Sequence, residues 1–428
     1  MMDKKPANWM KLDNAALIYP ATMNRNWMAL FRLSATLTEP VDAEVLQRAL
    51  IRTLPRFPSL SVRLRRGMFW FYLEHNESAA VVEQDAANPC VRMRFRDNGG
   101  RALRLRYYRN RIAVEFFHVL TDGKGGLVFL KTLVAEYLRL RYGADIPCGG
   151  DILDCGAPPE AEETEDSFRR FSGGGTQSRR EKKAYHITGT DEADGFIHIT
   201  TGEMDAEQVL SLAREKGVSL TEFLTAVLLL SVDAIQRRRE LNWRRYRPAK
   251  VCVPINLRRF FPSRTLRNFS SYVNPGINPR LGTYDLDETL KHVHHFMAIE
   301  VTEKQLTARF TTNVKQSHSA MLRVMPLFIK SAAMKMVYRQ VGDALSSTSL
   351  SNLGATALPE PMGTYVTHLD FILGPLAQNR VCAAAISYGG VLRVNFTRTI
   401  EEPVLEREFF TRLIRSGIHV RVSSNQRE

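Results

Sequence analysis

Apolar and polar positions alternate with two different periods along the first half of the chain. Residues 30–37 (LFRLSATL) follow the two-residue period of a strand, whereas residues 42–54 carry an apolar face with the period of a helix that Asp42 can cap. The same patterns predict strands at residues 60–64, 68–73, 91–95, 103–108 and 112–117, and a helix over residues 126–142. We therefore expect the first half to be a mixed α/β unit.

The second half repeats this alternation without a visible sequence repeat. A strand at residues 196–203 leads into a helix, and Ser219 with Glu222 forms a capping box for the helix that follows. That second helix contains the apolar run 223–232, which is too short to cross a bilayer, since a span takes about 20 residues. Further strands are predicted at residues 250–254, 269–277, 346–353, 366–373, 381–388 and 391–399, with helices near 285–302, 326–340 and 405–415.

A break in the pattern separates the two halves. Residues 149–180 contain Gly-Gly, Pro-Pro and an acidic run at 160–166, and they show no apolar period, so we interpret them as a solvated connector. The chain has 428 residues, and a single core rarely grows beyond roughly 250–300 residues. We therefore expect an N-terminal unit at 1–150, a linker at 151–190 and a C-terminal unit at 191–428.

Composition and charge narrow the class of protein and its location. Hydrophobic residues make up 44% of the chain and charged residues 24%, which is typical of a soluble globular protein. Five widely spaced cysteines without a CxxC pair argue against disulfides and zinc, and the start MMDKKPANWM lacks the apolar stretch of a signal peptide. We expect a cytoplasmic protein. The net charge of +14 favours an anionic partner, and nucleic acid, coenzyme A and an acidic carrier protein all qualify.

One segment combines residue types suited to catalysis. Residues 116–126 (FFHVLTDGKGG) place His118, Asp122 and Gly123 in the pattern His-x-x-x-Asp-Gly, between a predicted strand and a predicted helix. A side chain at such a strand end emerges at the rim of a sheet, and the glycines allow a sharp turn and close approach. The pattern alone is weak, because a chain of this length shows it by chance in roughly one case in twenty. A core histidine with Asp122 as a helix cap is the alternative.

The motif and three later segments together resemble a known superfamily. His118–Gly123 resembles the HHxxxDG signature of chloramphenicol acetyltransferases, nonribosomal-peptide condensation domains, wax ester synthases and alcohol O-acetyltransferases. Residues 218–232 are similar to the helix that opens their second half, and residues 253–275 resemble the strands that follow it. SLSNLG at residues 349–354 resembles the SNxxG element of wax ester synthases and alcohol O-acetyltransferases. The landmarks occur in the same order and cover most of the chain outside the linker.

Two positions depart from the superfamily pattern. Phe117 replaces the first histidine of the HH pair, but the second histidine, which the superfamily uses in catalysis, is present as His118. The DFGWG element of plant acyltransferases is absent, which argues against that branch.

The resemblance implies a fold, a reaction and a set of site residues. The expected fold is α/β, with two chloramphenicol acetyltransferase-like subdomains forming a V around a central tunnel. The reaction is transfer of an acyl group from a coenzyme A or carrier-protein thioester to a small-molecule alcohol or amine. A neutral histidine, with a pKa of about 6.5, suits His118 as the general base. The resemblance pairs Asp122 with Arg258, or with Arg259 after a one-residue shift.

The same resemblance assigns the oxyanion of the reaction to the second half. Ser349, Ser351 and Asn352 are the candidate donors, and the strand phase that would choose among them is open. The reaction that the resemblance implies requires neither a metal nor a bound cofactor, and the thioester enters as a substrate.

Three alternatives remain open at the level of sequence. Because Phe117 departs from the signature, the chain could be a catalytically degenerate condensation-like module that only binds a carrier protein. His292 and His295 share a helix face that zinc could use, but no third ligand is visible. The basic segment 236–250 (QRRRELNWRRYRPAK) is a solvated face, a docking surface for coenzyme A or a carrier protein, or a site for single-stranded nucleic acid. Nucleic acid is not the expected partner, since no reading motif is recognised.

Overall fold

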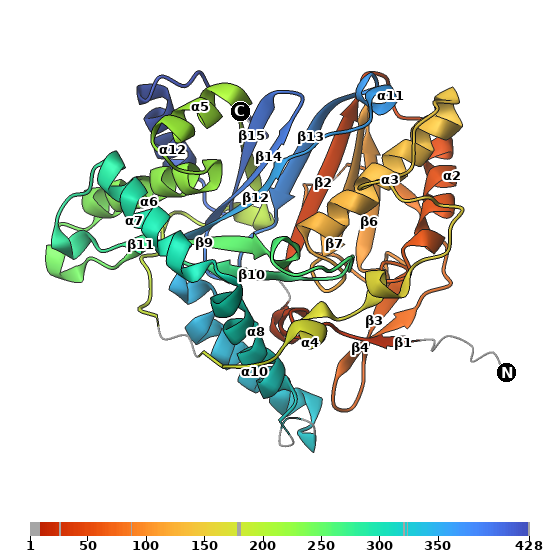
Figure 1. Cartoon of the computed structure of the whole chain (residues 1–428), viewed down its shortest axis with the longest axis horizontal. Coiled ribbons are helices and arrows are strands. Elements are labelled where there is room, and N and C mark those ends of the chain that lie inside the picture. Colours follow the sequence, from red (N-terminus) through yellow and green to blue (C-terminus); the bar gives the residue numbers. More distant parts are fainter. Residues whose placement is uncertain are drawn as a thin grey trace.

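The computed structural model describes residues 9–24, 27–86, 88–177, 181–319, 322 and 324–426. Within these residues the chain forms two α/β halves that open as a V, and in each half helices cover one face of a sheet (Figure 1). Each half has its own cluster of buried apolar side chains. The two-layered units expected from the alternating pattern are therefore present.

The first sheet has the strand order β13-β2-β7-β6-β5. Helices α2 and α3 cover its outer face, and a separate small sheet with the order β1-β4-β3 lies below it beside the short helix α1 (Figure 1). The elements are β1 (Trp9–Lys11), α1 (Ile18–Thr22), β2 (Leu30–Leu37), α2 (Ala43–Thr53), β3 (Val62–Arg66), β4 (Phe71–His75), β5 (Val82–Gln84), β6 (Leu103–Tyr108), β7 (Arg111–Phe117), α3 (Gly123–Tyr142) and β13 (Val366–Leu373).

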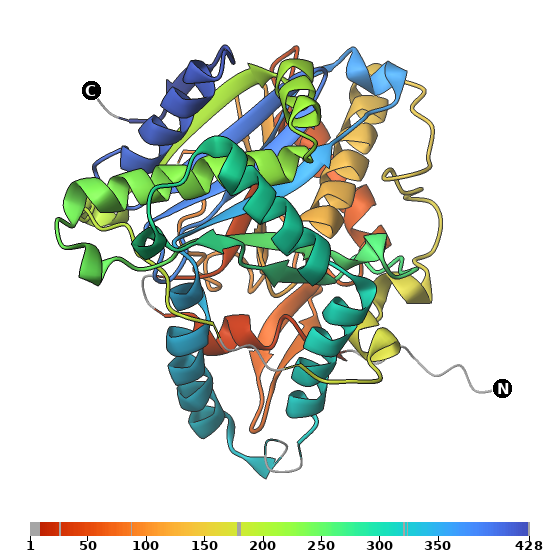
Figure 2. The ribbon, with the colours of Figure 1, turned by 60° about the vertical axis from the view of Figure 1, so that its left-hand side comes forward.

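The second sheet has the order β10-β9-β12-β14-β15-β8-β16, and β11 also pairs with β9. Helices α5, α6, α7 and α12 lie on its outer side, and α8 and α10 extend from the lower end of the molecule (Figures 1 and 2). The elements are α4 (Ser167–Phe171), β8 (His198–Asp205), α5 (Ala206–Glu215), α6 (Leu220–Arg239), β9 (Ala249–Asn256), β10 (Ser270–Val273), β11 (Gly276–Ile277), α7 (Leu286–Glu300), α8 (Glu303–Ser317), α10 (Leu327–Val341), β12 (Thr348–Ala355), α11 (Glu360–Gly363), β14 (Val381–Tyr388), β15 (Val391–Arg398), α12 (Val404–Arg415) and β16 (Arg421–Ser424).

Helix α6 forms as its capping box and apolar run predict. The Ser219 amide donates to the Glu222 carboxylate, the Glu222 amide donates to the Ser219 hydroxyl, and the apolar run is buried in the second core. In the part of the chain that the structure describes, no single helix is long and apolar enough to cross a membrane. Only α5 and α6 taken together reach that length and composition, and they meet at an angle of 84°.

Strand β13 crosses from the second half of the sequence into the first sheet. It pairs antiparallel with β2, from Val366 opposite Leu37 to Leu373 opposite Phe31. Leu369 and Phe371 are buried in the first core, and this burial is the physical reason for the crossover. The sequence analysis placed residues 366–373 in the C-terminal unit, so the division at residue 191 does not describe the sheets.

Part of the expected linker is packed against the protein, which corrects its interpretation as a solvated connector. In the acidic run, Glu163 is buried and pairs with Arg56, whose Nη2 lies 2.7 Å from Oε1. Phe168 of α4 is buried against Phe269 and Phe310, with ring centres 5.2 and 5.8 Å away. One aromatic anchor and one buried ion pair order this segment, and a search for an apolar period does not detect such isolated contacts.

The strand predicted at residues 91–95 is also wrong. The segment is irregular, and it covers a buried ionic cluster on the first sheet, where Arg104 donates to the Val91 carbonyl at 2.6 Å and the Cys90 amide donates to Glu115 at 2.9 Å. The backbone is thus used to satisfy buried charges, and β5 takes the edge of the sheet instead.

Candidate active site

His118 follows the last residue of β7, at the junction of the two halves. Its amide donates to the Ala29 carbonyl at 2.9 Å, which extends the pairing of β7 with the segment before β2. The imidazole is half-buried; it stacks on Tyr19 of α1 with ring centres 4.8 Å apart and meets the edge of Phe31 at 5.2 Å. Two aromatic rings therefore restrict the orientation of the imidazole.

A buried polar chain continues from the ring into the second half. The His118 Nδ1 lies 2.9 Å from Oδ1 of Asn268, and Nδ2 of Asn268 donates to the His118 carbonyl and to Oδ2 of Asp13, both at 3.0 Å. Burial raises the pKa of Asp13, although Arg267 and the hydrogen bond from Asn268 act in the opposite direction. Asp13 also accepts from the Ala16 amide at 2.8 Å, so it is held on both oxygens.

This chain determines which imidazole nitrogen carries the proton. The His118 carbonyl can only accept, so the nitrogen of the Asn268 amide group must face it and the oxygen must face Nδ1 of His118. An amide oxygen cannot donate, so Nδ1 of the imidazole is the donor. In the neutral ring Nε2 then holds the lone pair, which is the form that a general base needs.

Asp122 holds the loop that carries His118. It caps α3 by accepting from the Gly125 amide at 3.1 Å, and its other oxygen accepts from Nη1 of Arg258 and the Phe269 amide, both at 2.8 Å. Burial works to raise the pKa of this carboxyl, but Arg258 and the amides of Phe269 and Gly125 together outweigh it, so the pKa of Asp122 lies below its usual value. Arg258 is the partner that the resemblance implied.

Arg258 also ties this loop to the backbone of the second half. Its Nε donates to the Thr265 carbonyl at 3.0 Å, and its Nη2 donates to the Arg267 carbonyl at 2.6 Å. The Thr121 hydroxyl donates to the Leu266 carbonyl at 2.6 Å. Arg258, Leu266, Asn268 and Phe269 thus hold the loop that carries His118, which makes the pairing of the halves part of the candidate site.

Glycines allow this close contact. A Cβ on Gly125 would lie 2.2 Å from the Leu266 carbonyl oxygen, which no side chain tolerates. A Cβ on Gly123 would lie 2.8 Å from the end of the Leu353 side chain of β12. Gly123 therefore lets β12 of the second sheet approach the loop directly.

The contacts of β12 settle the strand phase that was open in the sequence. Leu350 lies in the second core, and Asn352 donates to the Thr221 hydroxyl at 3.1 Å and accepts from the Gly354 amide at 2.8 Å. Leu353 packs on the first core. Since side chains alternate along a strand, Ser349 and Ser351 share the side of Leu353, toward the first half, whereas Asn352 faces α6.

The two serines differ from Asn352 in their hydrogen bonding as well. The Ser349 hydroxyl is buried and has no hydrogen-bond partner among the described residues. A buried hydroxyl without a partner is costly, and such groups in native proteins call for an explanation. A substrate oxygen is one explanation, whereas the side chain of Asn352 is already engaged.

Tyr19, Asn268 and Asp13 were not predicted from the sequence as site residues. Asp13 and Tyr19 lie before the first patterned strand, in a segment without apolar period. Asn268 lies within residues 253–275, which resemble the superfamily strands, and directly before Phe269; its polar type at the edge of a buried strand was the available signal.

Phe117 is fully buried in the first core, and its ring centre lies 6.3 Å from that of Phe95. The position of the missing histidine is therefore a packing position in this chain, and the departure from the signature leaves the His118 contacts intact.

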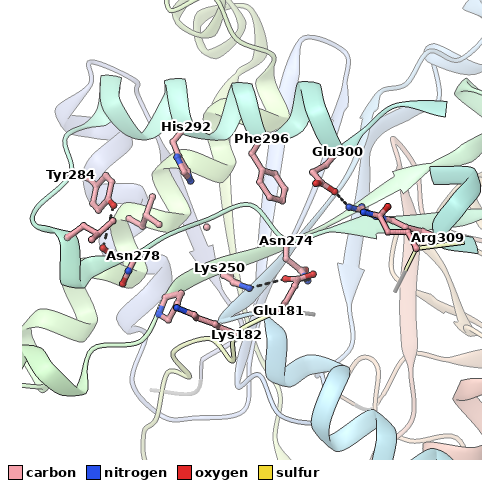
Figure 3. A pocket seen from close by; sticks show the side chains of 15 residues that line it. Glu181, Lys182, Lys250, Asn274, Asn278, Tyr284, His292, Phe296, Glu300 and Arg309 are labelled. Atoms are coloured by element: carbon pink, nitrogen blue, oxygen red, sulfur yellow. Dashed lines mark hydrogen bonds and ion pairs between the residues drawn. The ribbon is translucent and has the colours of Figure 1, made fainter. Parts of the chain in front are cut away.

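The helix with three histidines lies elsewhere. His292, His294 and His295 are exposed on α7, and His294 pairs with Glu222 at 3.1 Å. Within the described residues, no group of three or more His, Cys, Asp or Glu side chains could hold a metal. Figure 3 shows His292 and Phe296 facing a hollow of about 660 Å³, and on its opposite side Lys250 pairs with Glu181 at 2.9 Å. The hollow is lined by the second half and does not include His118.

Comparisons with known proteins place this fold. No protein-family model matches the sequence, and no curated protein matches it significantly. Solved structures match over nearly the whole chain. The trichothecene 15-O-acetyltransferase of Fusarium sporotrichioides is 9% identical with a TM-score of 0.61, covering 95% of this chain and 96% of that one.

Two condensation domains are similar to the same extent. The first condensation domain of the calcium-dependent antibiotic synthetase, in complex with a substrate analogue, is 15% identical with a TM-score of 0.59 and covers 96% of this chain and 97% of its own. The starter condensation domain of rhizomide synthetase, in complex with C8-CoA, is 12% identical with a TM-score of 0.60, covering 96% and 94%. The chain thus has the two-subdomain fold of condensation domains and chloramphenicol acetyltransferase-like proteins, as the sequence analysis expected.

Proposed function

We propose that this protein is an acyltransferase that moves an acyl group from a coenzyme A or carrier-protein thioester to an alcohol or amine, with His118 as general base. The observation that carries the proposal is the Asp13–Asn268–His118 chain, which leaves the lone pair on Nε2. A lone pair on Nε2 is what a general base needs in order to take a proton from an acceptor. The SNxxG element favours an acceptor of the alcohol type.

The proposed reaction follows from these positions. Nε2 of His118 takes the proton of the acceptor hydroxyl or amine as its oxygen or nitrogen attacks the thioester carbonyl carbon. Ser349 or Ser351 donates to the oxyanion that forms. The carbon–sulfur bond then breaks, and the imidazolium returns the proton to the departing thiolate. The products are an ester or amide and a free thiol, and no covalent acyl-enzyme, metal or bound cofactor takes part.

The buried residues around His118 contribute to the proposed reaction by holding the reacting groups in place. Positioned proton transfer is worth about 10²–10⁴ in rate, and donors aimed at the oxyanion add to it. Asp122 and Arg258 do not touch the substrate; they position the loop. No disulfide joins the described cysteines, which fits a reducing compartment, and we propose that the protein acts in the cytoplasm.

The neighbour bound to C8-CoA supports a thioester donor of this kind. The test is to supply purified protein with acyl-CoA or acylated carrier protein together with alcohols and amines, and to measure both free thiol and acylated acceptor. Thiol release that requires the acceptor and His118 supports transfer. Thiol release without acceptor would indicate hydrolysis. Binding of the carrier protein without turnover would instead support the degenerate, carrier-binding module.

A further inference from the structure

Helix α10 presents two chemically different faces. On its inner face, Leu327 and Lys330 are buried, and Lys330 donates to the Phe69 carbonyl at 2.9 Å. The Lys330 ammonium also lies 3.2 Å from the ring centre of Trp70, in a cation–π contact. The inner face is therefore anchored on the β3–β4 hairpin, which leaves the outer face fixed in position and uncovered.

The outer face of α10 is apolar. Phe328 and Met336 are 65% and 64% exposed, and Val337 is 55% exposed. The exposed apolar residues of this helix are Phe328, Ile329, Ala332, Ala333, Met336 and Val337. A surface helix of a soluble protein normally turns polar residues outward, so this outer face needs an explanation.

The hairpin tip extends this surface. Met68, 74% exposed, lies between β3 and β4, and its carbonyl accepts from the Leu327 amide at 2.9 Å, which joins the tip to the start of α10. Val324, 73% exposed, lies just before the helix. We call Met68, Val324, Phe328, Ile329, Met336 and Val337 the α10 face. Figures 1 and 2 both show α10 and this hairpin together at one end of the molecule.

The sequence around the α10 face is mainly basic. Residues 304–342 contain seven Lys or Arg and no Asp or Glu, in a chain whose net charge is +14. Two of these seven are engaged within the protein, since Lys330 is buried and Arg309 pairs with Glu300. Lys335 and Arg339 are exposed on α10 itself, beside the apolar residues. Apolar side chains flanked by exposed cations are complementary to a surface that is apolar inside and anionic at its boundary with water.

We propose that the α10 face docks on an anionic lipid surface. Such a surface accepts shallow insertion of apolar side chains, and each nearby Lys or Arg gains from anionic headgroups. The face consists of the outer side of one helix and a hairpin tip, which suits insertion into a lipid boundary. An acidic carrier protein and a second copy of the chain are the competing occupants, and the experiment below separates them.

Docking would place the candidate active site close to the lipid. The inner side of α10 packs on α1, and Tyr338 lies 5.8 Å from Trp27 by ring centres. Tyr19 of α1 stacks directly on His118. A single short helix thus separates the docking helix from His118, which suits a lipid-soluble substrate. The docking proposal rests on the surface alone and stands whether or not the protein transfers acyl groups.

The experiment measures binding of the full chain to vesicles by co-sedimentation. Wild-type protein is expected to bind phosphatidylglycerol-containing vesicles, and to bind phosphatidylcholine-only vesicles more weakly. The double variant F328S/M336S should bind at least about tenfold more weakly, because it loses its inserting side chains. K335E/R339E should lose the preference for anionic vesicles. The matched control L241S/L281S removes two exposed apolar side chains elsewhere, 94% and 78% exposed, and should bind like wild type.

Thermal unfolding confirms that each variant is folded before its binding is compared. The proposal is overturned if the wild-type protein ignores anionic vesicles, or if F328S/M336S binds them as well as wild type. Sedimentation of the protein without vesicles tests for a dimer, and a binding assay with a purified acyl carrier protein tests for a carrier complex. A dimer or a carrier complex that F328S/M336S abolishes, in the absence of vesicle binding, would assign the face to that partner instead.

Discussion

Histidines stand at two candidate functional positions, His118 and the three histidines of α7, and the two positions differ in how the surrounding residues hold the imidazoles. His118 stands alone in its motif, yet two aromatic rings, an amide and a buried carboxylate determine its orientation and tautomer. Helix α7 carries His292, His294 and His295 within four residues, yet all three are exposed. The comparison shows that a reactive histidine is identified by what fixes it, and the number of histidines in a segment carries less information.

The largest expected effect compares the same substitution at the two places. His118→Ala should lower the rate of acyl transfer by about 10²–10⁴, because it removes the proton acceptor. The double variant H292A/H295A should keep the wild-type rate, since neither side chain reaches His118. Both are measured as thiol release with an acceptor present. A folded His118→Ala variant with the wild-type rate would remove the distinction between the two places.

The second prediction compares a buried with an exposed acid. Asp122→Ala should lower the free energy of unfolding by about 3–5 kcal/mol, because it leaves Arg258 buried without its partner. Asp287, which pairs with Lys216 on the surface, is the matched control, and Asp287→Ala should change stability little. Urea unfolding measures both. Equal losses would mean that the loop is not held as the contacts indicate.

The pH dependence of the same variant follows from the pKa of Asp122. Its folded pKa lies below the value of 3.8 for an ordinary aspartate, so its contribution to stability is present above pH 3.8. That contribution is lost as pH falls below 3.8 through the folded value. The difference in unfolding free energy between wild type and Asp122→Ala should therefore shrink in that acid range and stay constant near neutrality.

A third, smaller effect sharpens the comparison at His118 itself. Asn268→Ala should lower kcat about tenfold and leave KM nearly unchanged, because the tautomer is no longer selected while the substrate surface stays intact. The pH profile of kcat should also shift, which loss of packing alone would not produce. Asn274→Ala is the control, since Asn274 binds Glu181 in the hollow of the second half. Equal changes in both variants would argue against a positioning role.

The smallest expected effect concerns the basic segment 236–250. Three of its arginines contact protein groups, and Arg244, Arg245 and Arg247 are exposed at its far end. R244E/R245E/R247E should raise KM for the thioester about threefold at low salt with kcat unchanged, if this face guides an anionic donor. Added salt should remove the difference. An unchanged KM would indicate that the segment is a solvated face without a role in docking the donor.

The sequence predicted the helices and strands whose apolar positions recur with a regular period. The period-two run of β2, the N-cap and apolar face of α2, and the capping box and apolar run of α6 follow from local rules, and the HxxxDG spacing located His118 and Asp122. Local patterns do not report pairing between distant residues. The exchange of β13, the ordering of Glu163 by Arg56 and the Asp13–Asn268 chain each depend on contacts more than a hundred residues apart.

The residues of the candidate site also divide into those that the sequence predicted and those that depend on distant contacts. Arg258 was expected because the resemblance supplied a partner for Asp122, whereas Asn268 lay one residue from a recognised landmark and carried no motif of its own. The choice between serine and asparagine on β12 required the strand phase. That phase is set by two contacts: Asn352 bonds Thr221 on one side of the strand, and Leu353 packs against Gly123 on the other side.

The exchange of β13 also has a consequence for biosynthesis. The strand that completes the edge of the first sheet leaves the ribosome more than three hundred residues after its partner β2. During that interval the edge of β2 is exposed, and an exposed strand edge promotes association with other chains. The two halves therefore cannot mature one after the other. A fragment of the first half, residues 1–150, is expected to aggregate, and a peptide of residues 364–374 that supplies β13 should reduce this aggregation.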